Sequence, residues 1–507
     1  MNATHFDVLI TGAGVSGVGM ACHLVRNSPG KTFAILERRD DLGGTWDLFR
    51  YPGIRSDSDM YTFGYNFRPW TGAKVLADGA SIKQYVRETA EEYGVDQHIR
   101  YQRKVVRSNW SSEDRRWHVE VLREDNGETE HYTASFVVGC TGYYNHDQGY
   151  KPSFTGEKSF KGQIIHPQHW PEDLDYQGKK VIVIGSGATA VTLVPSMAED
   201  CEHITMLQRS PTYMLPVPTV DPSIQLLQKL LPARLAYRIT RLRNIAANKG
   251  IYEASRSRPK VVSRLLLGLV RRQVGSGVDM RHFQPSYNPW DQRLCAVADG
   301  DLFRVLREGK ASIVTDHIDR FTARGIKLKS GEELEADIII TATGLDLQIL
   351  GGMDLEIDGQ PVPVNERMIY RNVMLEGVPN AAMIFGYTNL SWTMKADIAA
   401  EFVCRVLNHM DKKGYQVAQP VDNGNNRTDD TFMGALDSGY IQRAADRLPR
   451  KGREEPWMAT QNYLHDKQDL RYGAIEDGSL AFDGRLRRLR PSRTSQMVGQ
   501  LRTALSN

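Results

Sequence analysis

Two glycine-rich loops have the spacing that brings a main chain close to a pyrophosphate. The first contains Gly12, Gly14 and Gly17, the second spans residues 185–190, and each follows an apolar run and opens a helix-like stretch. Glycines permit the tight turn, and the helix N-terminus supplies unpaired N–H groups and a positive dipole end. One such loop would indicate only a nucleotide. Two of them predict a bound flavin and a visiting nicotinamide, with electron transfer between them.

The residues beyond each loop predict which dinucleotide it holds. Glu37 follows the apolar stretch 32–36, and its carboxylate can accept hydrogen bonds from ribose hydroxyls. Because the same carboxylate would repel a 2′-phosphate, we expect FAD at the first loop. The stretch 204–207 leads instead to Arg209 and Ser210, which can bind a 2′-phosphate, so we expect NADPH at the second loop. The alternative is that Arg209 is an ordinary surface arginine. The expected contacts in the second loop are Gly185, Ser186, Gly187, Ala188, Thr189 and Ala190.

Composition and cysteine use exclude several classes of protein. The 507 residues are 41% hydrophobic and 25% charged, which is typical of a globular enzyme of two or three domains. We find neither a signal-peptide pattern nor an apolar run of about 18 residues, so a cytoplasmic location is expected. The five cysteines are scattered and form no CxxC pair, which excludes a dithiol redox centre.

One segment between the loops identifies a family. Residues 160–171, FKGQIIHPQHWP, match the pattern FxGxxxHxxxWP, the fingerprint of type I Baeyer–Villiger monooxygenases, and residues 43–57 resemble the flavin-side loop of that family. Segments 57–61, 287–295 and 386–389 resemble its ethionamide-activating branch. Without this resemblance, His166 and His169 would form half of a metal site with no further ligand nearby, so no metal is predicted.

The resemblance implies an FAD-containing monooxygenase that depends on NADPH and O2. NADPH would reduce the flavin, O2 would add at flavin C4a, and the peroxyflavin would convert ketones to esters or lactones or oxidise the sulfur of sulfides and thioamides. Arg293 matches the catalytic arginine of the family and Asp57 its carboxylate partner. A fixed cation would stabilise the peroxide and the tetrahedral adduct by about 3 kcal/mol. Spacing alone would favour a structural ion pair for Arg293.

The resemblance also supplies the expected cofactor contacts. Ser56 and Gln292 depart from the cyclohexanone-type branch, which has a cysteine and a lysine there, so binding of the 2′-phosphate would depend mainly on Arg209. Trp46 could equally be a core residue. Arg55, Ser56 and Asp57 are expected where nicotinamide meets flavin. The expected FAD contacts are Ser16, Glu37, Gly44, Thr45, Trp46, Asp47, Leu48, Asp57 and Val105.

These anchors predict an α/β fold with two Rossmann-like dinucleotide-binding domains, one for FAD and one for NADPH, and a helical insertion. The FAD domain is assigned residues 1–144 and 344–507, the NADPH domain residues 145–222 and 295–343, and the insertion residues 223–294, with residues 392–410 as a helix. The site is expected where the two domains meet.

The insertion contains a basic segment. Residues 223–272 hold 12 Lys or Arg and one acid, Glu253, in a chain whose net charge is +3. The aliphatic side chains recur at helical spacing, which predicts amphipathic helices: Leu227, Leu230, Leu231, Leu235, Ile239 and Leu242. Such helices can rest on anionic membranes, but we favour a helical cap over the active site whose charges are solvated.

The basic stretch 485–490 is interpreted as a tail, and no nucleic-acid partner is expected.

Two other functions remain open at this stage. One is an N- or S-oxygenating flavin monooxygenase without ketone activity, because attack on sulfur needs no stabilised tetrahedral oxyanion. The other is a redox sensor that binds flavin and NADPH without oxygenating a substrate. The expected partners are therefore a small ketone or sulfide and O2.

Overall fold

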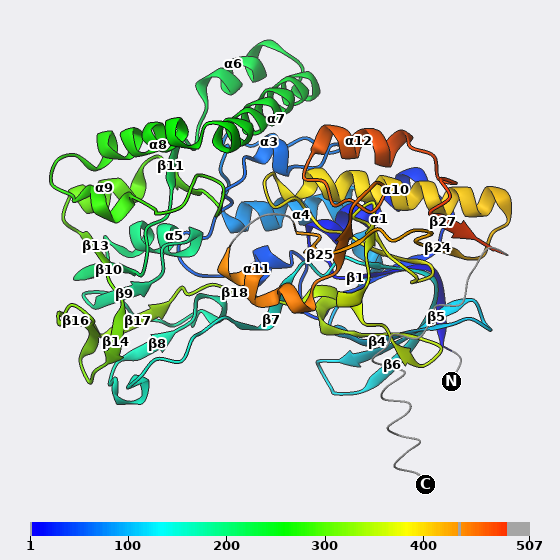
Figure 1. Cartoon of the computed structure of the whole chain (residues 1–507), viewed down its shortest axis with the longest axis horizontal. Coiled ribbons are helices and arrows are strands. Elements are labelled where there is room, and N and C mark those ends of the chain that lie inside the picture. Colours follow the sequence, from blue (N-terminus) through cyan, green and yellow to red (C-terminus); the bar gives the residue numbers. More distant parts are fainter. Residues whose placement is uncertain (1–2, 434–437, 484–507) are drawn as a thin grey trace, which may run out of the picture.

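The computed structural model, which describes residues 3–433 and 438–483, has two α/β lobes side by side (Figure 1). A nine-stranded mixed sheet forms the centre of the first lobe. Its strands run in the order β20 (Gln360–Pro361), β19 (Asp354–Ile357), β4 (Arg103–Ser111), β5 (Arg116–Arg123), β6 (Thr129–Gly139), β1 (Thr4–Thr11), β2 (Phe33–Leu36) and β3 (Ile99–Arg100), with β23 (Ala381–Met383) also beside β6.

The central strand β1 explains why this sheet forms where it does. Val8, Leu9 and Ile10 are fully buried, and parallel partners pair with β1 on both sides, Val8 opposite Phe33 of β2 and Leu9 opposite Val137 of β6. A continuous apolar run is what a strand covered on both faces requires. Helix α1 (Val15–Asn27) follows the first glycine loop, and α10 (Trp392–Lys413) packs against it. Further helices of this lobe are α4 (Gly79–Glu92) and α12 (Tyr463–Tyr472).

The second lobe contains a five-stranded sheet in which all pairs are parallel. The strand order is β13 (Ala311–Thr315), β10 (His203–Gln208), β9 (Lys180–Ile184), β17 (Ile338–Thr341) and β8 (Gln163–Ile165). Helices α5 (Ala188–Met197) and α9 (Asp301–Arg307) pack together and against the sheet. A small antiparallel sheet of β14 (Ile318–Phe321), β15 (Gly325–Leu328) and β16 (Glu333–Glu335) lies beyond it.

The lobes are joined by two crossing segments that pair as an antiparallel ribbon, β7 (Tyr144–Gly149) and β18 (Leu345–Leu347). His166, from the family fingerprint, packs at this crossing, because a Cβ atom on Gly149 would lie 2.0 Å from its ring. The Nδ1 atom of His166 accepts a hydrogen bond from the amide of Gln168 at 3.2 Å. The fingerprint therefore shapes the connection between the lobes.

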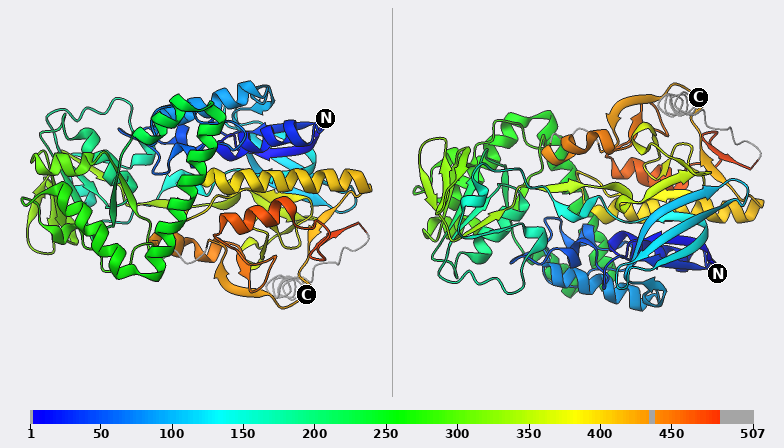
Figure 2. Two further views of the ribbon diagram at one scale, coloured as in Figure 1. Left: turned by 90° about the horizontal axis from the view of Figure 1, so that it is seen from above. Right: turned by 90° about the horizontal axis from the view of Figure 1, so that it is seen from below.

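The helical insertion lies between β11 (Met214–Val217) and β12 (Cys295–Ala298), which pair with each other. It consists of α6 (Pro222–Leu230), α7 (Ala233–Ser257) and α8 (Pro259–Val274). From above, α7 crosses the junction of the two lobes (Figure 2). No helix in residues 3–433 or 438–483 is long and apolar enough to cross a bilayer.

The helices expected in the insertion are present, but their aliphatic residues do not mark the buried face. The leucines and isoleucines counted as the apolar face lie mostly in solvent: Leu230 is 69% exposed and Leu242 is 65% exposed. The side of α7 that faces the protein contains Tyr237, Thr240 and Arg241, all buried. Periodicity identified the helix but not its buried face, because main-chain carbonyls of the first lobe provide polar partners there.

The fold class is confirmed, since two Rossmann-like lobes and a helical insertion are present. The expected helix at 392–410 is α10. The domain limits at residues 144 and 344 stay a prediction. The basic stretch 485–490 lies outside the described residues.

Candidate active site

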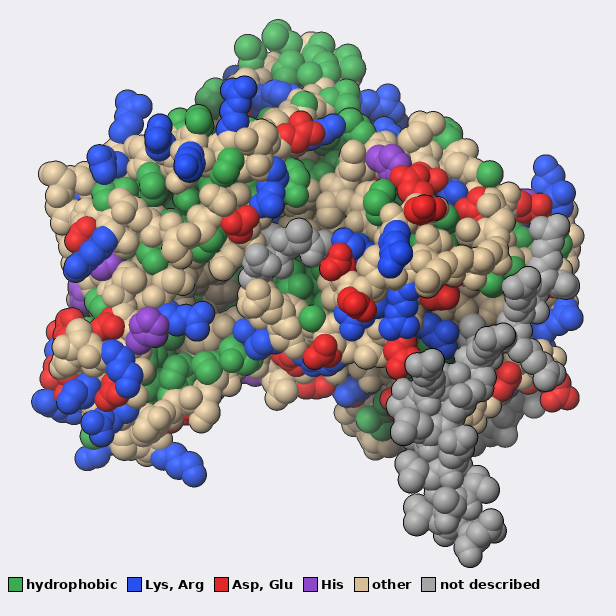
Figure 3. All heavy atoms as spheres, viewed as in Figure 1, with side chains coloured by type: hydrophobic (Ala, Val, Ile, Leu, Met, Phe, Trp, Pro, Cys, Tyr) green, Lys and Arg blue, Asp and Glu red, His purple; other side chains and the backbone are tan. Residues whose placement is uncertain are grey.

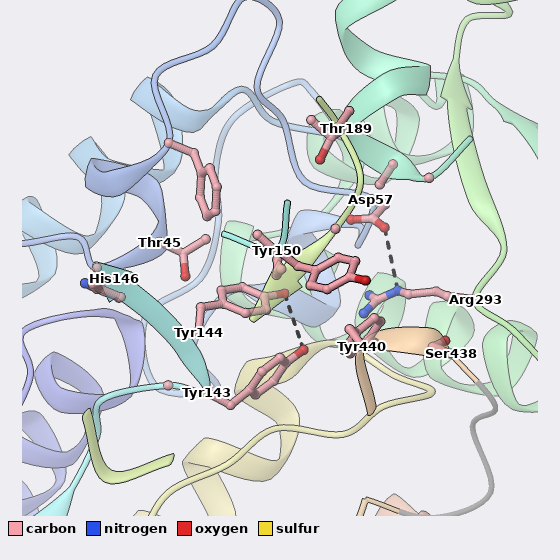
Figure 4. Close-up of a pocket in the computed structure, with 18 of the residues that line it drawn as sticks. Thr45, Asp57, Tyr143, Tyr144, His146, Tyr150, Thr189, Arg293, Ser438 and Tyr440 are labelled. Atoms are coloured by element: carbon pink, nitrogen blue, oxygen red, sulfur yellow. Dashed lines mark hydrogen bonds and ion pairs between the residues drawn. The ribbon is translucent and has the colours of Figure 1, made fainter. Parts of the chain in front are cut away.

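A cavity of about 900 Å³ lies between the lobes, and both glycine-rich loops line it. Figure 4 shows the side chains that project into it from both sides. Among the predicted site residues, the first lobe contributes Gly12, Gly14, Ser16, Glu37, Gly44, Thr45, Trp46, Arg55, Ser56, Asp57 and Val105. The second lobe and its insertion contribute Gly185, Ser186, Gly187, Ala188, Thr189, Arg209, Ser210 and Arg293.

The first loop is fitted closely to its surroundings. Gly12 has φ +95°, and a Cβ atom there would lie 2.8 Å from the carbonyl oxygen of Cys140. Glu37 accepts hydrogen bonds from the amides of Ala13 at 2.6 Å and Arg39 at 2.9 Å. Burial raises the pKa of this carboxyl, against the effect of the two amides. Each carboxylate oxygen retains a lone pair, so Glu37 can brace the loop and still accept a ribose hydroxyl.

The second loop leaves room for a ligand. Gly185 has φ +146°, and a Cβ atom there would lie 2.3 Å from the carbonyl oxygen of Ala342. A Cβ atom on Gly187 would meet no protein atom within 4 Å, although the residue lines the cavity. This is the opening that a pyrophosphate needs to approach a helix N-terminus. Arg209 and Ser210 follow β10 at the cavity wall and are exposed.

Asp57 and Arg293 face each other across the junction. Arg293 Nε lies 3.6 Å from Asp57 Oδ2, and about a third of each side chain stays accessible. The Asp57 carboxylate raises the pKa of the Arg293 guanidinium further above its ordinary value, so the cation is fixed at every accessible pH. Arg293 comes from the loop before β12, and Asp57 precedes the short helix α3 (Met60–Phe63). The structure thus brings together two residues that spacing alone could not pair.

Three tyrosines that the sequence analysis missed surround this pair. The hydroxyls of Tyr143 and Tyr144 lie 3.4 Å apart, and Tyr440 of α11 (Gly439–Ala444) lies beside the Arg293 guanidinium (Figure 4). Burial raises the pKa of Tyr144 to about 12 and raises those of the other two hydroxyls as well. All three are therefore neutral hydrogen-bond donors near neutral pH. The sequence offered one signal for two of them, because Tyr143 and Tyr144 directly follow Gly142. Tyr440 lies in a region without a motif and gave no signal.

His146 is a further missed residue of the wall. Burial lowers the pKa of its imidazole to about 4, so the ring is neutral near pH 7. Its Nδ1 atom is buried and has no hydrogen-bond partner within the part of the chain that the structure describes. An unpaired buried nitrogen at a cavity wall suits a polar group of a bound cofactor. Figure 4 places His146 near Thr45, away from Arg293.

Four predicted contacts do not reach the cavity wall. Asp47 is buried and bonds Arg39 and Lys83, each at 2.5 Å, because the short helix α2 (Thr45–Leu48) turns it away from Thr45 and Trp46. Leu48 packs in the core of the second lobe. Gly17 and Ala190 serve packing: a Cβ atom on Gly17 would lie 1.8 Å from the carbonyl oxygen of Gly12, and Ala190 is fully buried.

The structure also shows the contacts of Trp46, Arg55 and Ser56. Trp46 lines the cavity and contacts the ring of Phe63 edge-on at 5.8 Å, so it is both wall and packing residue. Arg55 pairs with Asp301 of α9 at 2.6 Å, which links the two lobes. The Ser56 hydroxyl donates to the carbonyl of Ser58 at 2.9 Å. The polar groups expected near the nicotinamide are therefore partly occupied by protein contacts.

Known proteins resemble this chain over nearly its whole length. Residues 74–223 match the model of the flavin-binding monooxygenase-like family, and residues 10–73 that of an NAD(P)-binding Rossmann-like domain. The FAD-containing monooxygenase EthA of Mycobacterium tuberculosis is 52% identical over 480 residues, 94% of this chain and 98% of EthA. MymA of the same organism is 55% identical over 482 residues, 94% of this chain and 97% of MymA. The chain belongs to the FAD-containing monooxygenases.

Solved structures support the fold of this FAD-containing monooxygenase. An oxidised steroid monooxygenase bound to NADP superposes with a TM-score of 0.75 at 19% identity, covering 94% of this chain and 99% of that one. A complex of OTEMO with FAD and NADP gives 0.72 at 21% identity, covering 95% and 100%. At these identities the likeness establishes the arrangement of the lobes. The predicted family and fold are thus confirmed.

Proposed function

We propose that this monooxygenase uses NADPH and O2 to insert oxygen beside ketone carbonyls, giving esters or lactones, and also oxidises sulfides and thioamides. The observation that carries the proposal is the Asp57–Arg293 pair at the junction of two loops built for dinucleotides. Bound FAD would pass on the two electrons taken from NADPH and provide the position at which O2 is activated. Around it, the residues of this chain bind, orient and stabilise charge.

Arg293 is assigned the task of holding negative charge. Oxygen insertion beside a carbonyl requires attack on the carbonyl carbon, and its oxygen then becomes an anion. A guanidinium that stays charged and faces the cavity can stabilise that anion by about 3 kcal/mol. Asp57 pairs with the guanidinium in the cavity, and the neutral tyrosines around it can donate hydrogen bonds to a ligand without adding charge. Attack on sulfur produces no such oxyanion and needs Arg293 less.

Product analysis tests the proposed reaction. The purified enzyme with NADPH and ¹⁸O2 is offered linear, cyclic and aryl ketones and a methyl aryl sulfide. We expect one ¹⁸O atom in an ester or lactone and one in a sulfoxide. Sulfoxide without any ester would favour the N/S-oxygenating alternative. NADPH oxidation that yields only hydrogen peroxide with every substrate would favour the redox sensor.

The choice between NADPH and NADH tests Arg209. This side chain is exposed at the cavity wall, where a bound ligand could reach it. Hydrogen bonds to a charged group contribute roughly 1.5–3 kcal/mol. We expect Arg209→Ala to raise KM for NADPH roughly 10- to 100-fold and to leave KM for NADH unchanged. Arg324→Ala, which removes an exposed arginine elsewhere in the second lobe, is the control. Equal losses with both coenzymes would contradict the assignment.

Peripheral membrane association is a second candidate property, and the exposed insertion supports it. Leu226 and Leu230 of α6 and Leu235, Ile239 and Leu242 of α7 are all exposed, and Figure 3 shows hydrophobic side chains gathered at this tip with Lys and Arg around it. Apolar side chains flanked by basic ones suit the headgroup region of an anionic lipid surface.

Vesicle flotation tests the membrane proposal. We expect the enzyme to float with phosphatidylglycerol vesicles at low salt and to float less at high salt or with neutral vesicles. Leu230→Asp combined with Leu242→Asp is expected to reduce flotation at least tenfold. Leu464→Asp, on a leucine of α12 that is 52% exposed, is the control away from the insertion. Flotation that is absent at low salt, or equal for all variants, would rule out this surface.

A further inference from the structure

The two residues of the proposed catalytic pair belong to different loops, and one helix contacts both loops. Asp57 lies just before α3 in the first lobe, whereas Arg293 ends a loop that leads from the insertion into β12. Helix α7 is 25 residues long and crosses the junction of the two lobes (Figure 2). Its first half contacts the segment after Asp57, and its last turns contact the segment before Arg293.

The first contact is a buried guanidinium. Arg241 Nη1 donates to the carbonyl oxygens of Tyr61 at 2.8 Å and Gly64 at 2.8 Å, at the end of α3, and the side chain is only 5% exposed. The Tyr237 hydroxyl, one turn earlier, donates to the carbonyl oxygen of Tyr65 at 3.1 Å. Tyr61 belongs to the four-residue helix and Gly64 and Tyr65 follow it directly, all three are buried, and the carbonyls at a helix C-terminus have no helical partners. Arg241 therefore fixes the segment that follows Asp57.

A second bond reaches the start of the same short helix. The amide of Asn244 donates to Asp59 Oδ1 at 2.8 Å, and Asp59 in turn caps α3 by accepting from the amide of Thr62. Asp59 stands two residues after Asp57. Positions 237, 241 and 244 are spaced four and three residues apart on one face of α7, and together they hold both ends of α3.

The far end of α7 holds the other loop. Arg256 Nη1 lies 2.6 Å from Asp291 Oδ1, and the other oxygen of Asp291 accepts the amide of Asn288 at 2.9 Å. Tyr252 contacts the ring of Trp290 edge-on at 5.5 Å. Trp290 has φ +68°, a conformation that a bulky residue adopts only where its neighbours hold it. These contacts fix the main chain two and three residues before Arg293.

We propose that α7 sets the separation of Asp57 and Arg293 across the two lobes, with Arg241 and Arg256 as positioning residues. Neither residue lines the cavity, so each acts through the loop that it holds. The expected effect on activity rests on the proposed roles of Asp57 and Arg293. The contacts of Arg241 and Arg256 with the two loops, which we call the clamp, can be measured independently of those roles.

The outer ion pair gives the sharper test, because Arg241 is buried and its removal could unfold the protein. Arg256→Gln removes the pair with Asp291, whose side chains are 44% and 26% exposed. The matched control is Arg243→Gln on the same helix, which removes a pair with Asp221 at 2.7 Å whose side chains are 42% and 27% exposed. Exposed pairs contribute little to global stability, so both variants should retain the wild-type Tm within about 2 °C.

Hydrogen–deuterium exchange of the flavin-loaded enzyme is the first readout. We expect Arg256→Gln to increase exchange in residues 286–294 at least threefold, while Arg243→Gln leaves that segment unchanged. Arg256→Lys, which keeps the charge, should restore most of the protection. In steady-state assays, Arg256→Gln should lower kcat for ketone oxygenation threefold to tenfold and raise the share of NADPH lost to hydrogen peroxide, with KM for NADPH unchanged.

The outcomes separate the clamp from the proposed chemistry. Exchange in residues 286–294 that is the same in both glutamine variants would overturn the proposal. Increased exchange with unchanged ketone oxygenation would also overturn it, since the loop would then be held without consequence for Arg293. If the wild-type enzyme oxygenated no ketone, the proposed function would be rejected, whereas the exchange result would still test the clamp. Arg241→Lys, with exchange followed in residues 57–66, is the second variant and should increase exchange there.

Discussion

Arg293→Ala is expected to lower kcat for ketone oxygenation roughly 10²- to 10³-fold, the effect of removing one well-placed charge-stabilising donor. The same variant should lose much less sulfide oxidation, because no tetrahedral oxyanion forms on sulfur. Flavin content and Tm report that the fold is intact. The measurement is the ratio of ester to sulfoxide formed under identical conditions, which we expect to fall at least 30-fold.

Arg293→Lys is the control for charge alone. A lysine keeps the positive charge but not the planar fork that a carboxylate and a developing oxyanion share. We expect it to recover part of the ketone activity, and Asp57→Asn to lose activity because the guanidinium would no longer be held in the cavity. If Arg293→Ala retained full ketone oxygenation, the role assigned to this residue would be wrong, whatever the effect on sulfur.

The local parts of this site could be predicted from sequence, because their requirements are local. Gly12 and Gly185 need positive φ and a close approach to a neighbouring carbonyl, and such needs leave a readable spacing of glycines. Asp57 and Arg293 leave no such pattern. They come from different lobes, and only the family resemblance paired them before the structure placed them 3.6 Å apart.

Two side-chain placements that the sequence could not predict have physical reasons of the same kind. Asp47 follows two cavity residues in sequence, but a helical turn directs it to Lys83 and Arg39. The leucines of α7 have the correct period for a helix, yet Leu242 is exposed while its neighbour Arg241 is buried. Hydrophobicity cannot predict that inversion, because it depends on carbonyl oxygens that another lobe presents to the helix.

Both residues that depart from the cyclohexanone-type branch, Ser56 and Gln292, line the cavity. Gln292 lines the cavity beside Arg293, and it supplies no charge for a 2′-phosphate. We therefore expect Arg209 to be the principal cation for that group, and its removal to change the coenzyme preference strongly. The Ser56 hydroxyl donates a hydrogen bond to the carbonyl of Ser58 and so stabilises the turn that contains Asp57.

Gly187→Val should abolish most NADPH binding without harming the fold, because the loop offers space there only to a ligand. Gly187 has φ −81° and extended ψ, which valine adopts readily, and its Cβ would meet no protein atom within 4 Å. A side chain in the path of a pyrophosphate costs about 1–3 kcal/mol, so KM for NADPH should rise roughly 10- to 100-fold with FAD content unchanged. Gly268→Val, at an open position in α8, should change nothing.

Gly185→Val is the contrasting variant in the same loop. Its φ of +146° excludes valine, and its Cβ would lie 2.3 Å from the carbonyl oxygen of Ala342, so folding of the second lobe should fail along with coenzyme binding. Thermal unfolding and coenzyme titration distinguish the two. If Gly187→Val bound NADPH normally, the pyrophosphate would not pass this glycine, and the opening at the start of α5 would have no ligand to explain it.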